Sequence, residues 1–376
     1  MSTAINEELH FELALNFIPK IGPAIFRNIM AYTGSARNFF EMPAGKAGKI
    51  PKVSKGLLEL RKSKDIFLKN AEDIIENCLK KKITIVSFSS PAFPARLKPM
   101  DDCPMILFVK GNLNLNPLRT VGVVGTRNAT EYGRNITKKI IDDLSPYTPT
   151  LISGLAYGID IEAHRASLFN QNPTIAVLGS SVDQIYPSLH KNTALEMMES
   201  GGLVSEYPPG TVMHPSNFPR RNRIIAGLSD ALIVVEAAQK GGALITAEIG
   251  YSYNKEIFAV PGNLQATYSE GCNQLIKQMK ASIYTGPKDL EEALSWTRED
   301  GSSNNQVSPG FVDLEKYGKE EQAILKILKD KKEVEIDRLA LLTDLSLSTL
   351  ASKLLTLEFE GIIKSLPGKK YRLQAY

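Results

Sequence analysis

The spacing of apolar positions changes twice along this chain and divides it into three parts. In the first part apolar side chains recur every three or four positions, for example in Glu7–Phe17 and Ala24–Tyr32. This spacing places them on one side of a helix, and it predicts short amphipathic helices over residues 1–80. The segment Ile18–Gly22, which joins the first two helices, recurs in weaker form as Ile50–Ser54.

This repeated turn leaves two interpretations open. Two short helices joined by a turn that contains Gly and Lys are typical of a helix-hairpin-helix or SAM-like module, in which the turn amides can hold a phosphate. A small helical packing module fits the residues at least as well, because the Gly pattern is incomplete in both copies of the turn.

The middle part, from Lys82 to Gly286, alternates short apolar runs with helical patterns. Runs such as Ala231–Val235 are apolar at every position, which is typical of a strand that is buried on both faces. Strands that alternate with helices form βαβ units around a parallel sheet. The predicted fold class is therefore α/β, with a Rossmann-like, doubly wound and mostly parallel sheet. The expected strands are Thr120–Val124, Thr150–Ile152, Thr174–Leu178, Leu203–Glu206, Ala231–Glu236, Glu256–Val260 and Ser282–Tyr284.

The last part begins after Thr297–Val312, a polar segment rich in Gly, Ser and Asn that predicts a flexible linker. Three helical patterns follow, and then two short strands joined at Pro367-Gly368. Three helices followed by a two-stranded wing predict a winged-helix-like domain. The expected domains are a small helical domain at 1–80, a Rossmann-like domain at 81–296, a linker at 297–318 and a winged-helix-like domain at 319–376.

Composition excludes several classes of protein. The chain has 376 residues and three scattered cysteines, an odd number that indicates neither a disulfide framework nor a metal cluster. No apolar run approaches the ~20 residues that span a bilayer, and no basic segment precedes an apolar one at the start. We therefore expect a cytoplasmic protein without membrane association. The net charge of +4 is too small to indicate nucleic acid by itself.

Small and polar residues follow almost every predicted strand of the middle part. Ligands of doubly wound sheets bind beyond the carboxyl ends of the strands, so these segments are where a site is expected. Gly125-Thr126-Arg127 follows the first strand, Ser153-Gly154 the second and Lys240-Gly241-Gly242 the fifth. Glycine lets backbone amides approach a ligand, and helix N-termini favour negative charge. The pattern predicts an anion-binding edge of the sheet.

The motifs of common nucleotide cofactors are missing from this edge. The turn after the first strand lacks G-x-G-x-x-G, and the second strand ends without the acidic residue that would bind a ribose. The chain has no P-loop, and its four histidines lack metal-ligand spacing. We therefore expect neither a cofactor nor a metal.

An arginine-rich segment before the fifth strand indicates the kind of anion. Arg220, Arg221 and Arg223 lie within four positions, with Phe218 and Asn222 nearby and no acidic residue among them. A solvated charged face would carry similar residues, but this segment has to lie near the anion-binding edge. Arginines that hold phosphates beside an aromatic ring that stacks on bases are typical of single-stranded DNA binding.

With these motifs in place, the middle part resembles the DNA-processing protein family DprA, also called Smf. The resemblance extends from Phe93 to Gly286 and keeps the order of the family's motifs. One departure is Gly241-Gly242-Ala243, where Ser-Gly-Ser is common, so two hydroxyls are missing there. The motifs include Gly125-Thr126-Arg127, Ser153-Gly154, Gly158-Ile159-Asp160, Ser205-Glu206-Tyr207, Phe218-Pro219 and Arg221–Ser229.

The resemblance implies a single-stranded DNA-binding protein of natural transformation and recombination. Members protect incoming single-stranded DNA, displace single-strand-binding protein and load the RecA recombinase. They act as homodimers through the Rossmann-like domain and need no nucleotide, so the resemblance implies a binding protein and not an enzyme. The DNA-binding residues it implies are Gly125, Thr126, Arg127, Ser153, Gly154, Phe218, Arg221, Asn222, Arg223, Lys240, Gly241 and Gly242.

Two alternatives stay open. Gly241-Gly242, Thr246 and Glu248 resemble a loose form of the loop of nucleoside-monophosphate phosphoribohydrolases, in which Glu248 would lie near a ribose. A recombination scaffold would instead act mainly through the C-terminal module. The predicted recognition helix of that module, Ser348–Glu360, carries Lys353 as its only basic residue, so we expect the module to be dispensable for DNA binding.

Overall fold

The computed structural model describes residues 7–297, 317–331, 334–359, 362–366 and 369–373. The chain divides into two compact units, Met1–Glu299 and Asp300–Tyr376. The predicted linker at 297–318 lies almost entirely outside the described residues, as does the predicted Pro367-Gly368 turn. The predicted boundary between a helical and a sheet domain at residue 80 stays a prediction, because both parts belong to the first unit.

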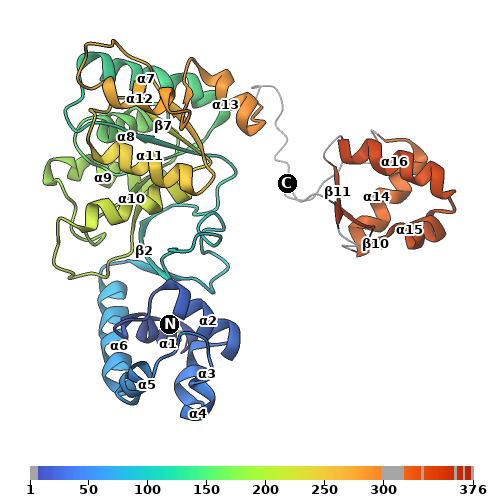
Figure 1. The fold of residues 1–376 in the computed structure, drawn as a ribbon, viewed down its shortest axis with the longest axis horizontal. Helices are drawn as coiled ribbons and strands as arrows, with labels where there is room; N and C mark the ends of the chain where they lie inside the picture. Colours follow the sequence, from blue (N-terminus) through green and yellow to red (C-terminus); the bar gives the residue numbers. More distant parts are fainter. Residues whose placement is uncertain (1–6, 298–316, 332–333, 360–361, 367–368, 374–376) are drawn as a thin grey trace. The chain divides into compact units, whose positions relative to one another are not determined.

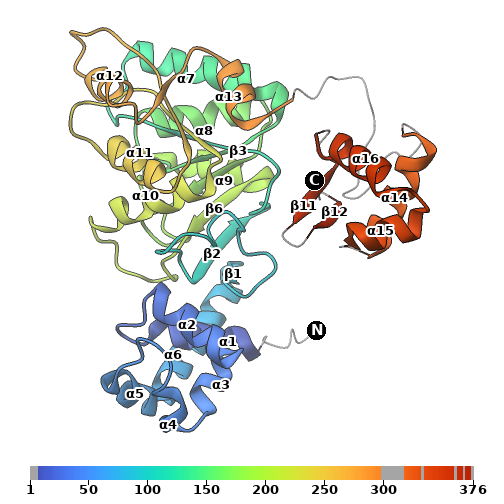
Figure 2. The same ribbon diagram turned by 45° about the vertical axis from the view of Figure 1, so that its right-hand side comes forward.

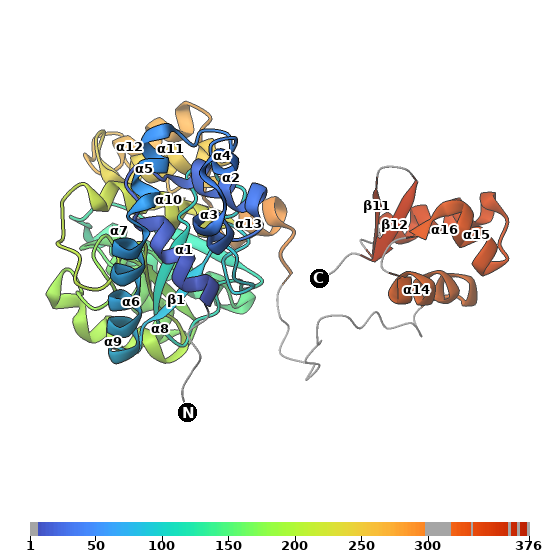
Figure 3. The same ribbon diagram turned by 90° about the horizontal axis from the view of Figure 1, so that it is seen from below.

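The first unit begins with the expected short helices, which pack at one end of the molecule's sheet (Figures 1 and 2). Their buried apolar side chains, among them Leu13, Phe26 and Phe39, belong to the same core cluster as one face of the nine-stranded sheet. Helices α1 and α6 both contact β1, the outermost strand, as Figure 3 shows from below. The helices are α1 (Glu7–Phe17), α2 (Pro23–Thr33), α3 (Ala36–Glu41), α4 (Ala44–Ala47), α5 (Lys55–Lys62) and α6 (Lys64–Lys80).

A nine-stranded sheet forms the centre of this unit, in the order β1-β2-β6-β5-β4-β3-β7-β8-β9. Strands β3 to β9 are all parallel, and only β1 and β2 at one edge pair antiparallel. The sheet is therefore mostly parallel, as predicted. The strands are β1 (Thr84–Ser87), β2 (Ile106–Gly111), β3 (Thr120–Val124), β4 (Thr150–Ser153), β5 (Thr174–Val177), β6 (Gly202–Ser205), β7 (Ala231–Val234), β8 (Glu256–Ala259) and β9 (Ser282–Ile283).

Helices cover both faces of this sheet, which explains the uninterrupted apolar strands. On β7, Leu232 and Val234 belong to one core cluster and Ala231 and Ile233 to the other. The first cluster includes side chains from α10 and α11, and the second includes side chains from α7 and α13. The covering helices are α7 (Glu131–Leu144), α8 (Ile159–Phe169), α9 (Lys191–Ser200), α10 (Asn217–Leu228), α11 (Gly242–Ser252), α12 (Glu270–Lys277) and α13 (Pro287–Leu294).

The strand order reverses between β3 and β7. From β3 the chain winds outward through β4, β5 and β6, and then returns to place β7 on the other side of β3, with Val124 paired to Val234. The connections that leave β3 and β7 consequently diverge to opposite sides. Such a reversal opens a crevice at the carboxyl ends of the two strands, and this is where doubly wound sheets bind ligands.

The second unit is the expected winged helix. Its helices surround a core that includes Leu328, Leu350 and Leu354, and its sheet has the order β10-β12-β11. Among the described residues no single helix is long and apolar enough to cross a membrane; only α15 and α16 together, bent by 109°, reach that length and composition. The elements are α14 (Lys319–Lys331), β10 (Val334–Glu335), α15 (Ile336–Thr343), α16 (Leu347–Phe359), β11 (Ile363–Leu366) and β12 (Lys370–Leu373).

Candidate nucleic-acid interface

A pocket of about 520 Å³ lies at the carboxyl ends of β3 and β7, where the strand order reverses. We call it the switch-point pocket. Its walls come from the segments that follow β3 and β7, from the start of α8, from α10 and α11, and from the loop before α12. The predicted site residues that line it are Gly125, Thr126, Arg127, Arg221, Asn222, Lys240, Gly241 and Gly242.

Arg127 supplies an exposed positive charge at the mouth of this pocket. It directly follows the tight turn after β3, which the backbone holds in place: the Thr126 amide donates to the Glu236 carbonyl at 2.7 Å, and the Ile159 amide donates to the Thr126 carbonyl at 3.2 Å. Gly158 has a φ of +77°, and a Cβ there would lie 2.2 Å from the Thr126 carbonyl oxygen. Only glycine allows this close approach, so the backbone fixes the direction in which Arg127 leaves the sheet.

Lys240 and the start of α11 form the opposite side of the pocket. Gly241 precedes α11, and no side chain in the described ranges caps the first amides of that helix. Both Gly241 and Gly242 are exposed, and a Cβ at either would meet no atom of the described residues within 4 Å. Uncapped amides at a helix N-terminus favour an anion, and the exposed Lys240 adds a full charge beside them. Asn222 steadies this turn by donating from Nδ2 to the Gly242 carbonyl at 3.3 Å.

Arg221 supports the pocket floor from inside the protein. Its side chain is only 4% exposed, and it donates to the carbonyls of Gly154, at 2.7 Å, and Val177. Gly154 directly follows β4, and Val177 is the last residue of β5. Burial lowers the pKa of Arg221 to about 10, against the opposing charge of Asp160. Burial also raises the pKa of Asp160, whose carboxylate accepts from the Gly154 amide at 3.2 Å. Arg221 therefore joins two strand ends and borders the pocket, whereas Arg127 extends from it.

Four predicted site residues do not line the switch-point pocket. Ser153 is fully buried and its hydroxyl donates to the Val123 carbonyl at 2.6 Å, while Gly154 is covered by the Arg221 guanidinium. Phe218 packs over Gly179 and beside Tyr186. These positions support the strand ends that shape the pocket.

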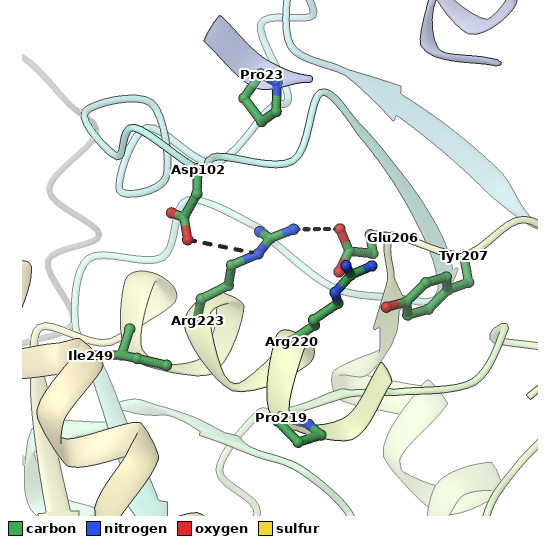
Figure 4. A pocket seen from close by; sticks show the side chains of 8 residues that line it. All are labelled: Pro23, Asp102, Glu206, Tyr207, Pro219, Arg220, Arg223 and Ile249. Atoms are coloured by element: carbon green, nitrogen blue, oxygen red, sulfur yellow. Dashed lines mark hydrogen bonds and ion pairs between the residues drawn. The ribbon is translucent and has the colours of Figure 1, made fainter. Parts of the chain in front are cut away.

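Arg223, the fourth of these residues, corrects one sequence-based expectation. The expectation that no acidic residue neutralises the arginine cluster is wrong at this position. Arg223 forms an ion pair with Glu206 from the end of β6, and its Nε lies 3.9 Å from an oxygen of Asp102 (Figure 4). Both acids are far from Arg223 in the sequence, so the local pattern of charges could not reveal them.

Sequence reasoning also missed two polar residues of the pocket. Tyr268, from the loop between β8 and α12, lines the wall, and its hydroxyl accepts from Asn128 Nδ2 at 3.2 Å. Asn128 follows Arg127 directly, so its place in the sequence could have indicated that it borders the pocket. Tyr268 carries no such signal, because the loop between β8 and α12 reaches the pocket only in the folded chain.

The family assignment follows from comparison of the whole chain with known proteins. Residues 84–295 match the family model described as DNA recombination-mediator protein A, and residues 314–369 match the DprA winged helix domain. The chain belongs to the DprA family. Protein Smf of Synechocystis is 29% identical over 395 aligned positions, which cover 98% of this chain and 99% of that protein.

Two solved DprA structures share the fold. The crystal structure of DNA processing protein A from Streptococcus pneumoniae is 31% identical, with a TM-score of 0.62 over 76% of this chain and 96% of that one. The structure of DNA processing protein A from Helicobacter pylori, described as revealing a unique single-stranded DNA binding mode, is 26% identical, with a TM-score of 0.52 over 57% of this chain and 97% of that one.

The carboxylate that a phosphoribohydrolase would need does not lie in the pocket of this DprA-family chain. Glu248 is exposed on α11, is not among the residues that line the switch-point pocket, and forms an ion pair with Lys280 at 2.7 Å. Within the described residues no three His, Cys, Asp or Glu side chains come together as metal ligands would. The geometry of the pocket favours binding of an anion over hydrolysis by Glu248.

Proposed function

We propose that this DprA-family chain binds single-stranded DNA in the switch-point pocket and acts there as a recombination mediator. The observation that supports this proposal most strongly is the convergence of Arg127, Lys240 and the uncapped amides of α11 on one pocket of about 520 Å³. No acidic side chain in the described part of the chain pairs with Arg127 or Lys240 within 4.0 Å. Both cations are therefore available to phosphates.

The pocket suits a flexible single strand better than a duplex. Phosphates of a single strand can turn into a concave site to meet Arg127 and the α11 amides, while an unstacked base meets the ring of Tyr268 or the apolar side chain of Ile245 on the pocket wall. Base stacking of this kind contributes ~1–3 kcal/mol per base and depends little on sequence. We therefore expect affinity that grows with strand length and shows little base preference.

The wider role in this proposal comes from the family resemblance. The chain would protect single-stranded DNA during natural transformation or recombination, displace single-strand-binding protein from it and load RecA on it, as a homodimer and without a nucleotide cofactor. The single-stranded DNA binding mode described for the Helicobacter pylori relative supports the proposed binding of single-stranded DNA. The family model, described as DNA recombination-mediator protein A, supports a role in recombination.

Binding measured as a function of salt tests the proposal. We expect an oligo-dT to bind more tightly than a duplex of the same length, with log affinity falling linearly in log salt at roughly −0.7 per neutralised phosphate. Fluorescence anisotropy at four or more salt concentrations measures both quantities. Equal affinity for the two DNAs, or a slope near zero, would contradict the proposal.

A further inference from the structure

A second hollow, of about 640 Å³, is lined in part by Pro219, Arg220 and Arg223 of α10 (Figure 4). Pro219 borders both this hollow and the switch-point pocket, so the two are neighbours along one helix turn. Pro23 of α2 and Ile249 of α11 form apolar parts of the wall. We call it the Glu206 hollow, after the acid at the end of β6 that lies in it.

Only one of the two oxygens of the Glu206 carboxylate has a hydrogen-bond partner among the described residues. Arg223 donates to Oε2, and the loop that carries Asp102, the second partner of Arg223, is tied to α2 through Arg27, which donates to the Met100 carbonyl at 2.8 Å. The other oxygen, Oε1, is buried and has no hydrogen-bond partner among the residues that the structure describes. A buried acceptor without a partner is costly, so Oε1 has the capacity to accept a hydrogen bond from a donor that enters the hollow.

Arg220 and Tyr207 lie beside this unused oxygen. Arg220 is exposed and forms no ion pair or hydrogen bond within the described part of the chain, although its charge and that of Arg223 oppose the burial that raises the pKa of Glu206. The half-buried Tyr207 ring stands next to them in Figure 4. The hollow thus presents a carboxylate acceptor, a guanidinium donor and an aromatic ring together.

We propose that the Glu206 hollow binds one unpaired base of the same single strand that occupies the switch-point pocket, with Glu206 Oε1 and Arg220 meeting its Watson–Crick edge. Every base presents a donor next to an acceptor on that edge, which matches a carboxylate next to a guanidinium and makes the subsite tolerant of sequence. In a duplex this edge is occupied by the partner base, so the subsite adds selectivity for single strands. The inference rests on the proposed function.

Because Glu206 is negatively charged, a phosphate site and a base site predict opposite effects of Glu206→Gln on DNA affinity. If the hollow only met phosphates, Glu206→Gln would remove a repelling charge and DNA would bind more tightly. In a base subsite the single oxygen of Gln would be taken by Arg223, which leaves an amide N–H where the base needs an acceptor. Binding would then weaken.

The experiment compares oligo-dT of ~20 nucleotides with a strand of the same length in which most positions are abasic. We expect Glu206→Gln and Arg220→Ala each to lower the ratio of the two affinities about fivefold, the effect of one or two hydrogen bonds, while the Arg165→Ala control on α8 leaves it unchanged. Arg220 is exposed, so its variant keeps the test valid even if Glu206→Gln lowers the unfolding temperature.

Three results would be decisive against one or both proposals. An unchanged ratio in Arg220→Ala, or tighter binding of oligo-dT by Glu206→Gln, would overturn the base subsite. If these results came with a large loss of oligo-dT affinity in Arg127→Ala, DNA binding in the switch-point pocket would be supported and only the base subsite would be wrong. If the parent protein failed to bind oligo-dT at all, the proposed function itself would fall.

Discussion

Arg127 is the residue from which most of the binding energy of the switch-point pocket is expected. It is exposed at the mouth of the pocket and its backbone is fixed by Thr126 and Gly158, so Arg127→Ala should remove a charge-assisted contact without disturbing the fold. Such a contact contributes ~1.5–3 kcal/mol, which predicts about 10- to 150-fold weaker binding of oligo-dT. Arg127→Lys should recover only part, because an ammonium cannot form the bidentate fork.

Fluorescence anisotropy at several salt concentrations, together with thermal unfolding, measures this prediction. Arg221→Ala is the informative contrast, because Arg221 is buried and joins the ends of β4 and β5. Its loss leaves two carbonyls without their donor and removes the positive charge that opposes the burial of Asp160, so it should lower the unfolding temperature whether or not DNA is present. Wild-type affinity in Arg127→Ala would mean that DNA binds elsewhere.

The burial of His164 predicts that the folded protein becomes less stable in weak acid. It is fully buried on α8 with Nδ1 2.6 Å from the Thr174 hydroxyl, and burial, with smaller effects of Arg221 and His190, lowers its pKa to about 3. The unfolded chain binds this proton below about pH 6.5 and the folded chain does not, so stability falls as pH drops from 6.5 toward 3. Between pH 7 and pH 5 the loss should be about 2 kcal/mol.

Urea unfolding at the two pH values measures this loss, and His164→Asn is its matched control. Asparagine can still bond to Thr174 but does not titrate, so the variant should lose less stability between pH 7 and pH 5 than the parent. Parallel stability curves for the two proteins would show that another group is responsible.

At the scale of elements, the start of α11 determines how strongly the two hydroxyls missing from Gly241-Gly242-Ala243 affect DNA binding. The backbone at Gly241 is extended, with φ at 178°, and a Cβ there would meet no atom within 4 Å in the part of the chain that the structure describes. Gly241→Ser should therefore fold normally, and its hydroxyl should strengthen oligo-dT binding by a few-fold, the effect of one added hydrogen bond. Anisotropy and thermal unfolding measure both effects.

Gly158→Ser is the control for this substitution, because it adds the same side chain to a turn of the same pocket. At Gly158 the positive φ and the Thr126 carbonyl leave no room for a Cβ, so that variant should be destabilised. Weaker DNA binding in a stable Gly241→Ser variant would show that the α11 amides do not face the phosphate.

At the scale of the whole molecule, the winged helix should be dispensable for DNA binding. Lys353, the only Lys or Arg of its second long helix α16, pairs with Glu321 at 2.9 Å and lies 3.9 Å from Glu320. The exposed side chains of that helix include Leu355 and Phe359, which suit a protein partner better than a major groove. A chain shortened to residues 1–299, the first compact unit, should bind oligo-dT within a few-fold of the full chain.

Anisotropy of the shortened chain at matched salt measures this prediction. The contrary possibility is the basic wing, in which Lys364, Lys370 and Arg372 lie on β11 and β12. Substituting these three by Ala in the full chain separates the wing from the rest of the winged helix. A loss as large as that of Arg127→Ala in either variant would place the wing in the DNA site.

The sequence by itself determined the parallel strands β3 to β9 and the edge at which the pocket lies, but not the antiparallel edge strands β1 and β2. Buried strands such as β7 must be apolar on both faces, and this requirement is visible in a few consecutive residues. The glycine, threonine and arginine after β3 likewise mark a strand end that faces a ligand, because a doubly wound sheet brings all such ends to one side.

Only the tertiary structure decided which arginine does what. Neighbouring positions on α10 point about 100° apart, so Arg220, Arg221 and Arg223 leave the helix in different directions although they are almost consecutive. Their partners come from distant segments: Gly154 and Val177 bury Arg221, and Glu206 neutralises Arg223. Charge and burial at a side chain depend on what folding brings beside it, and a local pattern of like residues carries no record of those neighbours.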